Sequence, residues 1–207
     1  MTTTSIVHRD WSKRFRGFLP VVIDVETGGV QPYTDALLEV AAVFLEINQD
    51  NQLCPAKTLA YHVIPFEGAR LDPKSLEFNK IDPYHPFRMA QEEKEVLVDL
   101  FQAIRAAAKK ARCHRAVLVG HNAWFDLLFI KTAAERHGLE MPLHSFTSFD
   151  TASLSGVFFG QTVLAKALEK AGIEFDVNEA HSAIYDAEKT AELFCQIVNR
   201  WDAVSFS

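Results

Sequence analysis

Two carboxylates stand close together near the start of the chain, at a spacing that could hold a metal ion. Asp24 and Glu26 end a run rich in Val and Ile, which predicts a strand over residues 20–26. Side chains of a strand alternate between its faces, so both carboxylates leave one face with backbones about 7 Å apart. Buried together they repel each other, and a divalent cation removes that cost. Solvated acids at an exposed strand end are the alternative interpretation of this pair alone.

A third acid lies where another predicted strand ends and a predicted helix begins. Asp126 falls in the first turn of a predicted helix over residues 124–136, directly after a predicted strand over 115–121, with Asn122 as the expected N-cap. Taken alone, an acid at this position is also typical of a residue that complements the helix dipole.

A histidine and a fourth acid surround the start of the last predicted helix, over residues 183–201. His181 precedes this helix and is expected on a loop, Ser182 is a candidate N-cap, and Asp186 lies near the helix start. A histidine by itself is commonly a surface or packing residue, so this pair gains meaning only beside the other acids.

The four acids and the histidine share one kind of position, the end of a strand or the beginning of a helix. In open α/β sheets such positions gather at one edge, where ligands bind. Carboxylates suit Mg²⁺ or Mn²⁺, whereas zinc prefers more His or Cys ligands. Two such ions about 3.5–4 Å apart can clamp the attacking and leaving oxygens of a phosphodiester. A histidine can accept a proton from the attacking water near neutral pH.

The predicted elements that must position these residues alternate in a regular order. We expect strands over residues 20–26, 36–47, 59–64, 115–121 and 145–150, and helices over 92–112, 124–136, 161–170 and 183–201. Short connections join the first three strands into an antiparallel meander, and the later elements alternate. The sequence therefore predicts an α/β fold: a ribonuclease-H-like, five-stranded mixed sheet flanked by helices.

Composition limits the class of protein. With 207 residues, 48% hydrophobic and 23% charged, the chain is expected to form a single domain over residues 1–207, with a polar N-terminal segment over 1–16. It has neither an apolar run long enough for a bilayer nor a signal-peptide core. Three scattered cysteines predict a cytoplasmic protein without disulfides. The net charge of −6 disfavours nucleic acid as a partner on average, although the local distribution of charge matters more.

Three segments resemble the motifs of the DEDDh superfamily of 3′→5′ exonucleases, in the right order: residues 24–28, 121–126 and 181–186. Six further segments resemble the bacterial ribonuclease T family: residues 14–18, 34–39, 134–136, 149–151, 160–164 and 194–201. The resemblance implies a homodimer that trims single-stranded 3′ ends of tRNA and other stable RNAs, acts also on single-stranded DNA, and releases nucleoside 5′-monophosphates. It implies two Mg²⁺ ions per subunit, with Mn²⁺ as a substitute.

The resemblance also implies roles for individual residues. Asp24, Glu26 and Asp186 would bind the metal ions, Asp126 would support one of them directly or through water, and His181 would be the general base. Phenylalanines would stack on the terminal bases, and arginines would hold backbone phosphates beside the partner subunit's site; these residues are Phe78, Phe125, Phe146, Arg14, Arg16 and Arg115. Core packing is the alternative role for each phenylalanine.

The chain departs from the family pattern at three positions. Val30 stands where a stacking Phe is common, Lys74 where a Glu can contact the terminal base, and Glu140 where a basic residue is usual. The first two changes put the family's end-sequence preference in doubt for this chain, but they leave the predicted chemistry unchanged.

Other functions remain open from the sequence. Within nucleases the alternatives are a proofreading-type DNA exonuclease and an oligoribonuclease. The segment that contains Asp24 and Glu26 also resembles the nucleophile loop of haloacid-dehalogenase-like phosphatases, but that interpretation leaves Asp126 and His181 without a role. A non-enzymatic alternative is a nucleic-acid-binding module with an inactive site.

Overall fold

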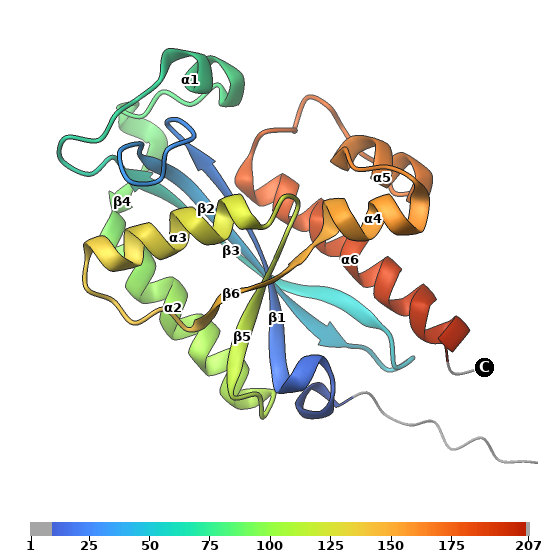
Figure 1. Cartoon of the computed structure of the whole chain (residues 1–207). Helices are drawn as coiled ribbons and strands as arrows, with labels where there is room; N and C mark the ends of the chain where they lie inside the picture. The colour runs from blue at the N-terminus through green and yellow to red at the C-terminus, as the bar shows by residue number, and fades with distance from the viewer. Residues whose placement is uncertain (1–9, 206–207) are drawn as a thin grey trace, which may run out of the picture.

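The computed structural model describes residues 10–205, which form a mixed six-stranded sheet with helices on both faces (Figure 1). The strand order across the sheet is β4-β3-β2-β1-β5-β6. The strands are β1 (Phe18–Thr27), β2 (Leu37–Ile47), β3 (Leu53–Ile64), β4 (Gln91–Glu92), β5 (Arg115–Gly120) and β6 (Leu143–Asp150). β1, β2 and β3 form the expected antiparallel meander, whereas β5 and β6 run parallel to β1.

The α/β fold class is confirmed, but the predicted strand count of five is wrong by one short strand. β4 has two exposed residues that pair with Val63 and Ile64 at the end of β3, and two residues are too few to form an alternating pattern. β3 also begins six residues earlier than predicted. The part that the prediction missed contains Pro55, which lies opposite an irregularity in β2. Proline is tolerated at such a position, although it argues against a strand when only the sequence is read.

Helices cover both faces of the sheet. They are α1 (Pro73–Asn79), α2 (Glu93–Lys110), α3 (Trp124–Arg136), α4 (Thr151–Phe159), α5 (Leu164–Ala171) and α6 (Ala183–Ser205), with short 3₁₀ turns over Trp11–Lys13, Phe15–Gly17 and Pro86–Arg88. Two of them, α1 and α4, were not predicted. α1 starts with a proline that looks like part of a loop but suits the first helical position, and α4 contains Gly156 and two serines, which weaken its helical signal.

The alternation of β1 divides its side chains between two cores. Val21, Ile23 and Val25 pack under α2 and α3, in the cluster that contains Leu100 and Phe101. Val22 packs on the opposite face with Ala187, Ala191 and Phe194 of α6. Asp24 and Glu26 share the parity of Val22, so the sheet presents both carboxylates toward the side on which α6 begins.

The N-terminal residues that the structure describes pack against the domain through two aromatic side chains. Trp11 and Phe15 pack against the core beside α6, and the Phe15 ring lies 4.8 Å from that of Phe149. These two aromatic residues fix the last part of the predicted N-terminal segment over residues 1–16 to the domain, while residues 1–9 lie outside the described residues. Among the helices described, none has the length and apolar character that crossing a membrane requires.

Candidate active site

Asp126 reaches the end of β1 from the first turn of α3. Its side chain is 4% exposed, and its Oδ1 accepts a hydrogen bond of 3.0 Å from the backbone N–H of Val25, between the two acids of β1. Gly120, at the end of β5, makes room for this contact, because a Cβ there would lie 3.1 Å from Oδ2 of Asp126 and 3.2 Å from the carbonyl oxygen of Ile23. The junction of β5 and α3 thus delivers a third carboxylate to the acids of β1.

The start of α3 is held by Asp150 and not by the predicted cap. Asn122 has a φ of +66° and lies one residue before the cap position, which Ala123 occupies without a side-chain hydrogen bond. Oδ1 of Asp150 accepts from the backbone N–H groups of Asn122 (2.8 Å) and Ala123 (3.3 Å), and the same carboxylate caps α4 through Ala152 and Ser153. Burial raises the pKa of Asp150, but these hydrogen bonds outweigh it, and the pKa falls below its usual value.

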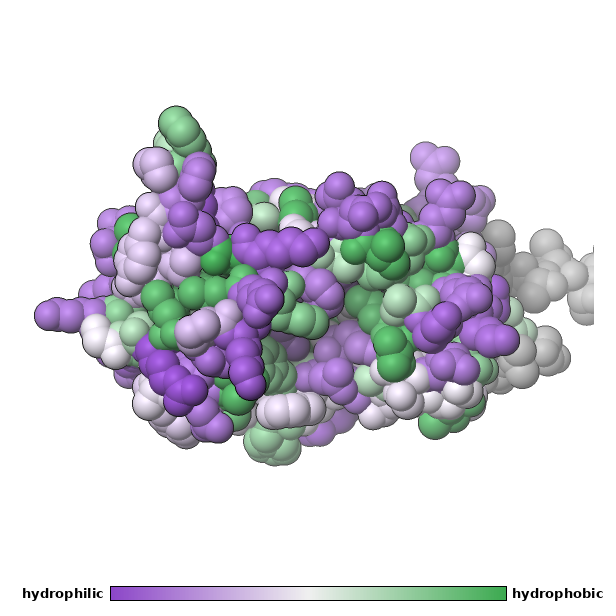
Figure 2. Space-filling view, turned by 90° about the horizontal axis from the view of Figure 1, so that it is seen from above, coloured by the Kyte–Doolittle hydropathy of each residue, from purple (hydrophilic) through white to green (hydrophobic). Residues whose placement is uncertain are grey.

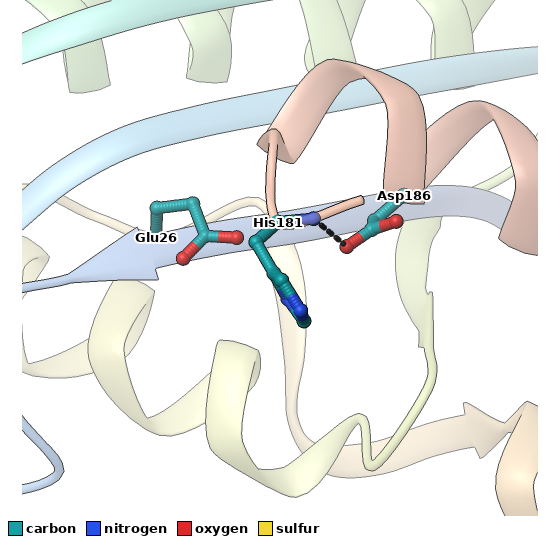
Figure 3. A group of neighbouring side chains, drawn as sticks. All are labelled: Glu26, His181 and Asp186. Atoms are coloured by element: carbon teal, nitrogen blue, oxygen red, sulfur yellow. Dashed lines mark hydrogen bonds between the residues drawn. The ribbon is translucent and has the colours of Figure 1, made fainter. Parts of the chain in front are cut away.

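The beginning of α6 completes the acidic cluster. Glu26 extends from β1, His181 lies on the loop before α6, and Asp186 projects from the first turn of the helix (Figure 3). One ligand atom from each of these three residues lies within 4.8 Å of the others. The backbone N–H of His181 donates to Oδ2 of Asp186 over 3.1 Å, in a loop where His181 adopts a positive φ of 68°. This hydrogen bond joins the loop that carries His181 to the first turn of α6.

Burial raises the pKa of every carboxylate in this group, and repulsion within the group raises the pKa of Asp24 and Glu26 further. Burial is the largest cause for Asp24, whose pKa lies well above its usual value, followed by the charges of Asp126 and Glu26. Burial and the charge of Asp186 raise the pKa of Glu26 to about 8, and burial raises that of Asp126 to about 7. Burial also raises the pKa of Asp186. At neutral pH the group therefore needs protons or cations to offset its charge.

The donor set fits a metal ion. Oδ1 of Asp186 is buried and has no hydrogen-bond partner among the described residues, which is costly for a carboxylate oxygen unless something else satisfies it. Glu26 and His181 offer further ligand atoms close by, and oxygen-rich sites select hard divalent cations. The acidic cluster can therefore hold a metal ion.

An open cavity of about 580 Å³ contains these acids. The residues that line it include the acids Asp24, Glu26, Asp126 and Asp186, the aromatic residues Phe78, Trp124 and Phe125, and also Val30 and Lys74. Figure 2 views the molecule from the top of Figure 1, toward which β1 points, and shows hydrophobic patches between hydrophilic side chains. A cavity with acids at its base and aromatic rings at its wall suits a nucleotide, which combines phosphate and base.

The structure brings two of the three predicted phenylalanines to the cavity. Phe78 is 63% exposed on α1, and its ring centroid lies 4.1 Å from that of His181. Phe125 lines the cavity while it packs on Phe129 at 4.9 Å, so it combines the predicted role with core packing. Phe146 lies elsewhere, exposed on β6 with its ring 4.5 Å from that of His144.

The three predicted arginines lie at the opposite end of the strands from the acids. Arg115 begins β5, opposite Phe18 at the beginning of β1. Arg14 forms an ion pair of 2.6 Å with Asp202, and Arg16 lies over the Phe18 ring at 5.3 Å. Within one chain these cations therefore lie too far from the strand end that carries the acids to contact it.

Sequence reasoning missed several residues that shape the site. Asn79 is buried and donates to the carbonyl oxygen of Thr27 over 3.1 Å, which fixes α1 beside β1. Nε2 of His121 donates to the carbonyl oxygen of Thr162 over 2.8 Å, and burial lowers the pKa of His121. The roles of Asn79 and His121 depend on contacts between elements that lie far apart along the chain, and no local sequence pattern predicts such contacts. Trp124 could have been found, since it stands within the motif next to Phe125.

Comparison with known proteins first defines the class of protein to which this chain belongs. A family model described as Exonuclease matches residues 21–194. The fold resembles that of E. coli exonuclease I in complex with a dT13 oligonucleotide, with a TM-score of 0.71 and 15% identity over 90% of this chain. A full-length 3′-exonuclease gives a TM-score of 0.69 with 18% identity over 89% of this chain. This chain spans 42% of exonuclease I and 62% of the 3′-exonuclease, so these likenesses establish the shared fold.

Curated relatives define the family. Ribonuclease T of Vibrio vulnificus is 56% identical over 194 residues, which are 93% of this chain and 89% of the relative. Ribonuclease T of Shewanella denitrificans is 55% identical over 92% of this chain and 85% of its own length, and that of Yersinia enterocolitica is 56% identical over 92% and 89%. The chain belongs to the ribonuclease T family and is a hydrolytic 3′→5′ exonuclease.

Proposed function

We propose that this chain is a Mg²⁺-dependent exoribonuclease that removes nucleoside 5′-monophosphates from single-stranded 3′ ends of tRNA and other stable RNAs in the cytoplasm. It would also act on single-stranded DNA. Relatives named ribonuclease T support RNA as a substrate, and exonuclease I, whose fold this chain shares, binds a dT13 oligonucleotide. Stacking on aromatic rings tolerates any base, which suits a trimming enzyme.

The observation that carries the proposal is Asp186: its buried Oδ1 has no hydrogen-bond partner among the described residues, and one ligand atom of this residue lies within 4.8 Å of ligand atoms of Glu26 and His181. Asp24, Glu26 and Asp186 would hold two Mg²⁺ ions, with Mn²⁺ able to substitute, and Asp126 would support the second ion directly or through water. When bound, such ions neutralise the phosphodiester and polarise it toward attack by water.

The chain's own residues would supply the remaining chemistry. His181 would accept the proton of the attacking water, and its loop position allows the imidazole to approach the 3′ end. Phe78 and Phe125 would hold the terminal base at the cavity wall. Phe146, on β6, would contact nucleotides further from the end. Val30 and Lys74 also line the cavity, so we expect an end-sequence preference different from that of relatives with Phe and Glu at these positions.

The position of the arginines supports a homodimer. Arg14, Arg16 and Arg115 lie at the far end of β1 and β5 from the acids, so they would bind phosphates of a strand that enters the partner subunit's cavity. An Arg→Ala set should reduce activity on long strands more than on very short ones. Equal losses on both would contradict this arrangement. The ion pair of Arg14 with Asp202 predicts that Arg14 contributes least.

One experiment tests the proposed reaction. Single-stranded RNA labelled at its 3′ or its 5′ end is incubated with the protein in Mg²⁺, in Mn²⁺ or in EDTA. We expect labelled mononucleotide from the 3′-labelled strand at once, a ladder from the 5′-labelled strand, and neither product in EDTA. Binding without turnover in Mg²⁺ would instead favour a nucleic-acid-binding module.

A further inference from the structure

Trp124 is exposed at the rim of the catalytic cavity. It is the first residue of α3, it is 65% exposed, and it lines the cavity two residues before the buried Asp126. Because α3 fixes the backbone of Trp124 beside the acids, the indole is presented at a defined place at the cavity rim. Exposed Trp is unusual on protein surfaces, and it is typical of positions that bind aromatic or apolar partners.

The neighbouring ring defines how a strand would meet this indole. The rings of Trp124 and Phe125 have centroids 5.8 Å apart and an interplanar angle of 90°. Both residues line the same cavity, so a strand whose last base stacked on Phe125 would bring its next base within reach of Trp124.

We propose that Trp124 is a stacking platform for the penultimate base and selects strands whose last two bases are unstacked; this rests on the proposed function of the cavity. Two perpendicular rings cannot both lie flat against two bases that are parallel. The strand must therefore turn between its last two nucleotides. A 3′ end that remains stacked in a duplex cannot make this turn, so Trp124 contributes to the choice of single strands.

A substitution series with modified substrates tests the platform. The variants are Trp124→Ala and Trp124→Phe, with Trp201→Ala as matched control, because Trp201 is 59% exposed at the far end of α6. Each is assayed on short single strands that carry either a normal base or an abasic residue at the penultimate position. Loss of one stacked base predicts a rise in KM of roughly 5- to 150-fold for Trp124→Ala on the normal strand.

The abasic strand separates stacking from structural damage. On it, Trp124→Ala and wild type should differ by much less than on the normal strand, Trp124→Phe should recover part of the affinity, and Trp201→Ala should match wild type throughout. An equal loss for Trp124→Ala on both strands would overturn the platform. If the wild-type protein releases no mononucleotide from either strand, the proposed function fails, and this outcome differs from every outcome that concerns Trp124 alone.

A binding measurement does not depend on turnover. In the Asp24→Asn background, a strand with 2-aminopurine at the penultimate position should lose fluorescence on binding, because the fluorophore stacks on the indole. Adding Trp124→Ala should abolish that quenching, whereas 2-aminopurine at the last position should still be quenched. Quenching at the penultimate position that survives the substitution would also overturn the platform.

Discussion

Replacing Glu26 with Gln should stabilise the metal-free protein at high pH. In the folded chain the pKa of Glu26 rises from 4.5 to about 8, chiefly through burial and the charge of Asp186. The folded state therefore binds more protons than the unfolded state between pH 4.5 and 8. Stability associated with Glu26 is fully present below pH 4.5 and is lost as the pH rises through about 8.

The size of the effect follows from this difference in pKa. A change from 4.5 to about 8 corresponds to about 5 kcal/mol of unfavourable free energy when Glu26 is ionised. Protonation of a neighbouring carboxyl such as Asp24 relieves part of the same repulsion. We therefore expect the free energy of unfolding of Glu26→Gln at pH 9 to exceed that of the wild type by about 2–3 kcal/mol. For a chain of this size the gain corresponds to a rise in Tm of roughly 5–10 °C. Gln keeps an oxygen that can accept from Asn79, so little else is lost.

The assay is thermal unfolding in EDTA from pH 5 to pH 9, repeated with Mg²⁺. The wild-type Tm should fall with rising pH in EDTA and recover with Mg²⁺, whereas Glu26→Gln should show a flatter profile and a smaller response to the ion. The exposed Glu67, changed to Gln, serves as the control and should follow wild type. A wild-type Tm that does not change with pH in EDTA, together with no gain for Glu26→Gln at pH 9, would refute the reasoning.

Three further predictions concern the groups around the cluster. His181→Ala should keep the Tm response to Mg²⁺ but lose about 10²–10⁴-fold in kcat, and unchanged kcat would reject His181 as general base. Asp150→Ala removes the shared cap of α3 and α4, so it should lower the free energy of unfolding in urea by about 1–3 kcal/mol. It should also lower kcat more than it changes KM, because Asp126 is displaced. If neither the free energy of unfolding nor kcat falls, the cap is dispensable. Glu93→Ala leaves Arg136 without its partner at 2.6 Å, so it should cost about 3 kcal/mol in urea unfolding without changing KM. A change below about 0.5 kcal/mol would contradict a structural role for this ion pair.

The arrangement of the main elements could be predicted because it depends on local pattern. The runs rich in Val with Ile or Leu around Asp24 and over residues 115–120, and the apolar spacing of α2, are signals typical of buried strands and amphipathic helices. β4, α1 and α4 gave no such signal, since two residues have no period, and helices that begin with proline or contain glycine resemble loops. These elements form only because the rest of the fold supports them.

The sequence by itself was enough to predict which residues would carry the chemistry, because each acid and His181 stands at a strand end or helix start, at a spacing that local geometry translates directly. Only the tertiary structure decided how they meet. The contact of Asp126 with Val25, the role of Asp150 in place of Asn122, and the ring of Trp124 at the cavity rim join residues from elements far apart along the chain. Such contacts depend on the packing of whole elements, and no window of neighbouring residues contains that information.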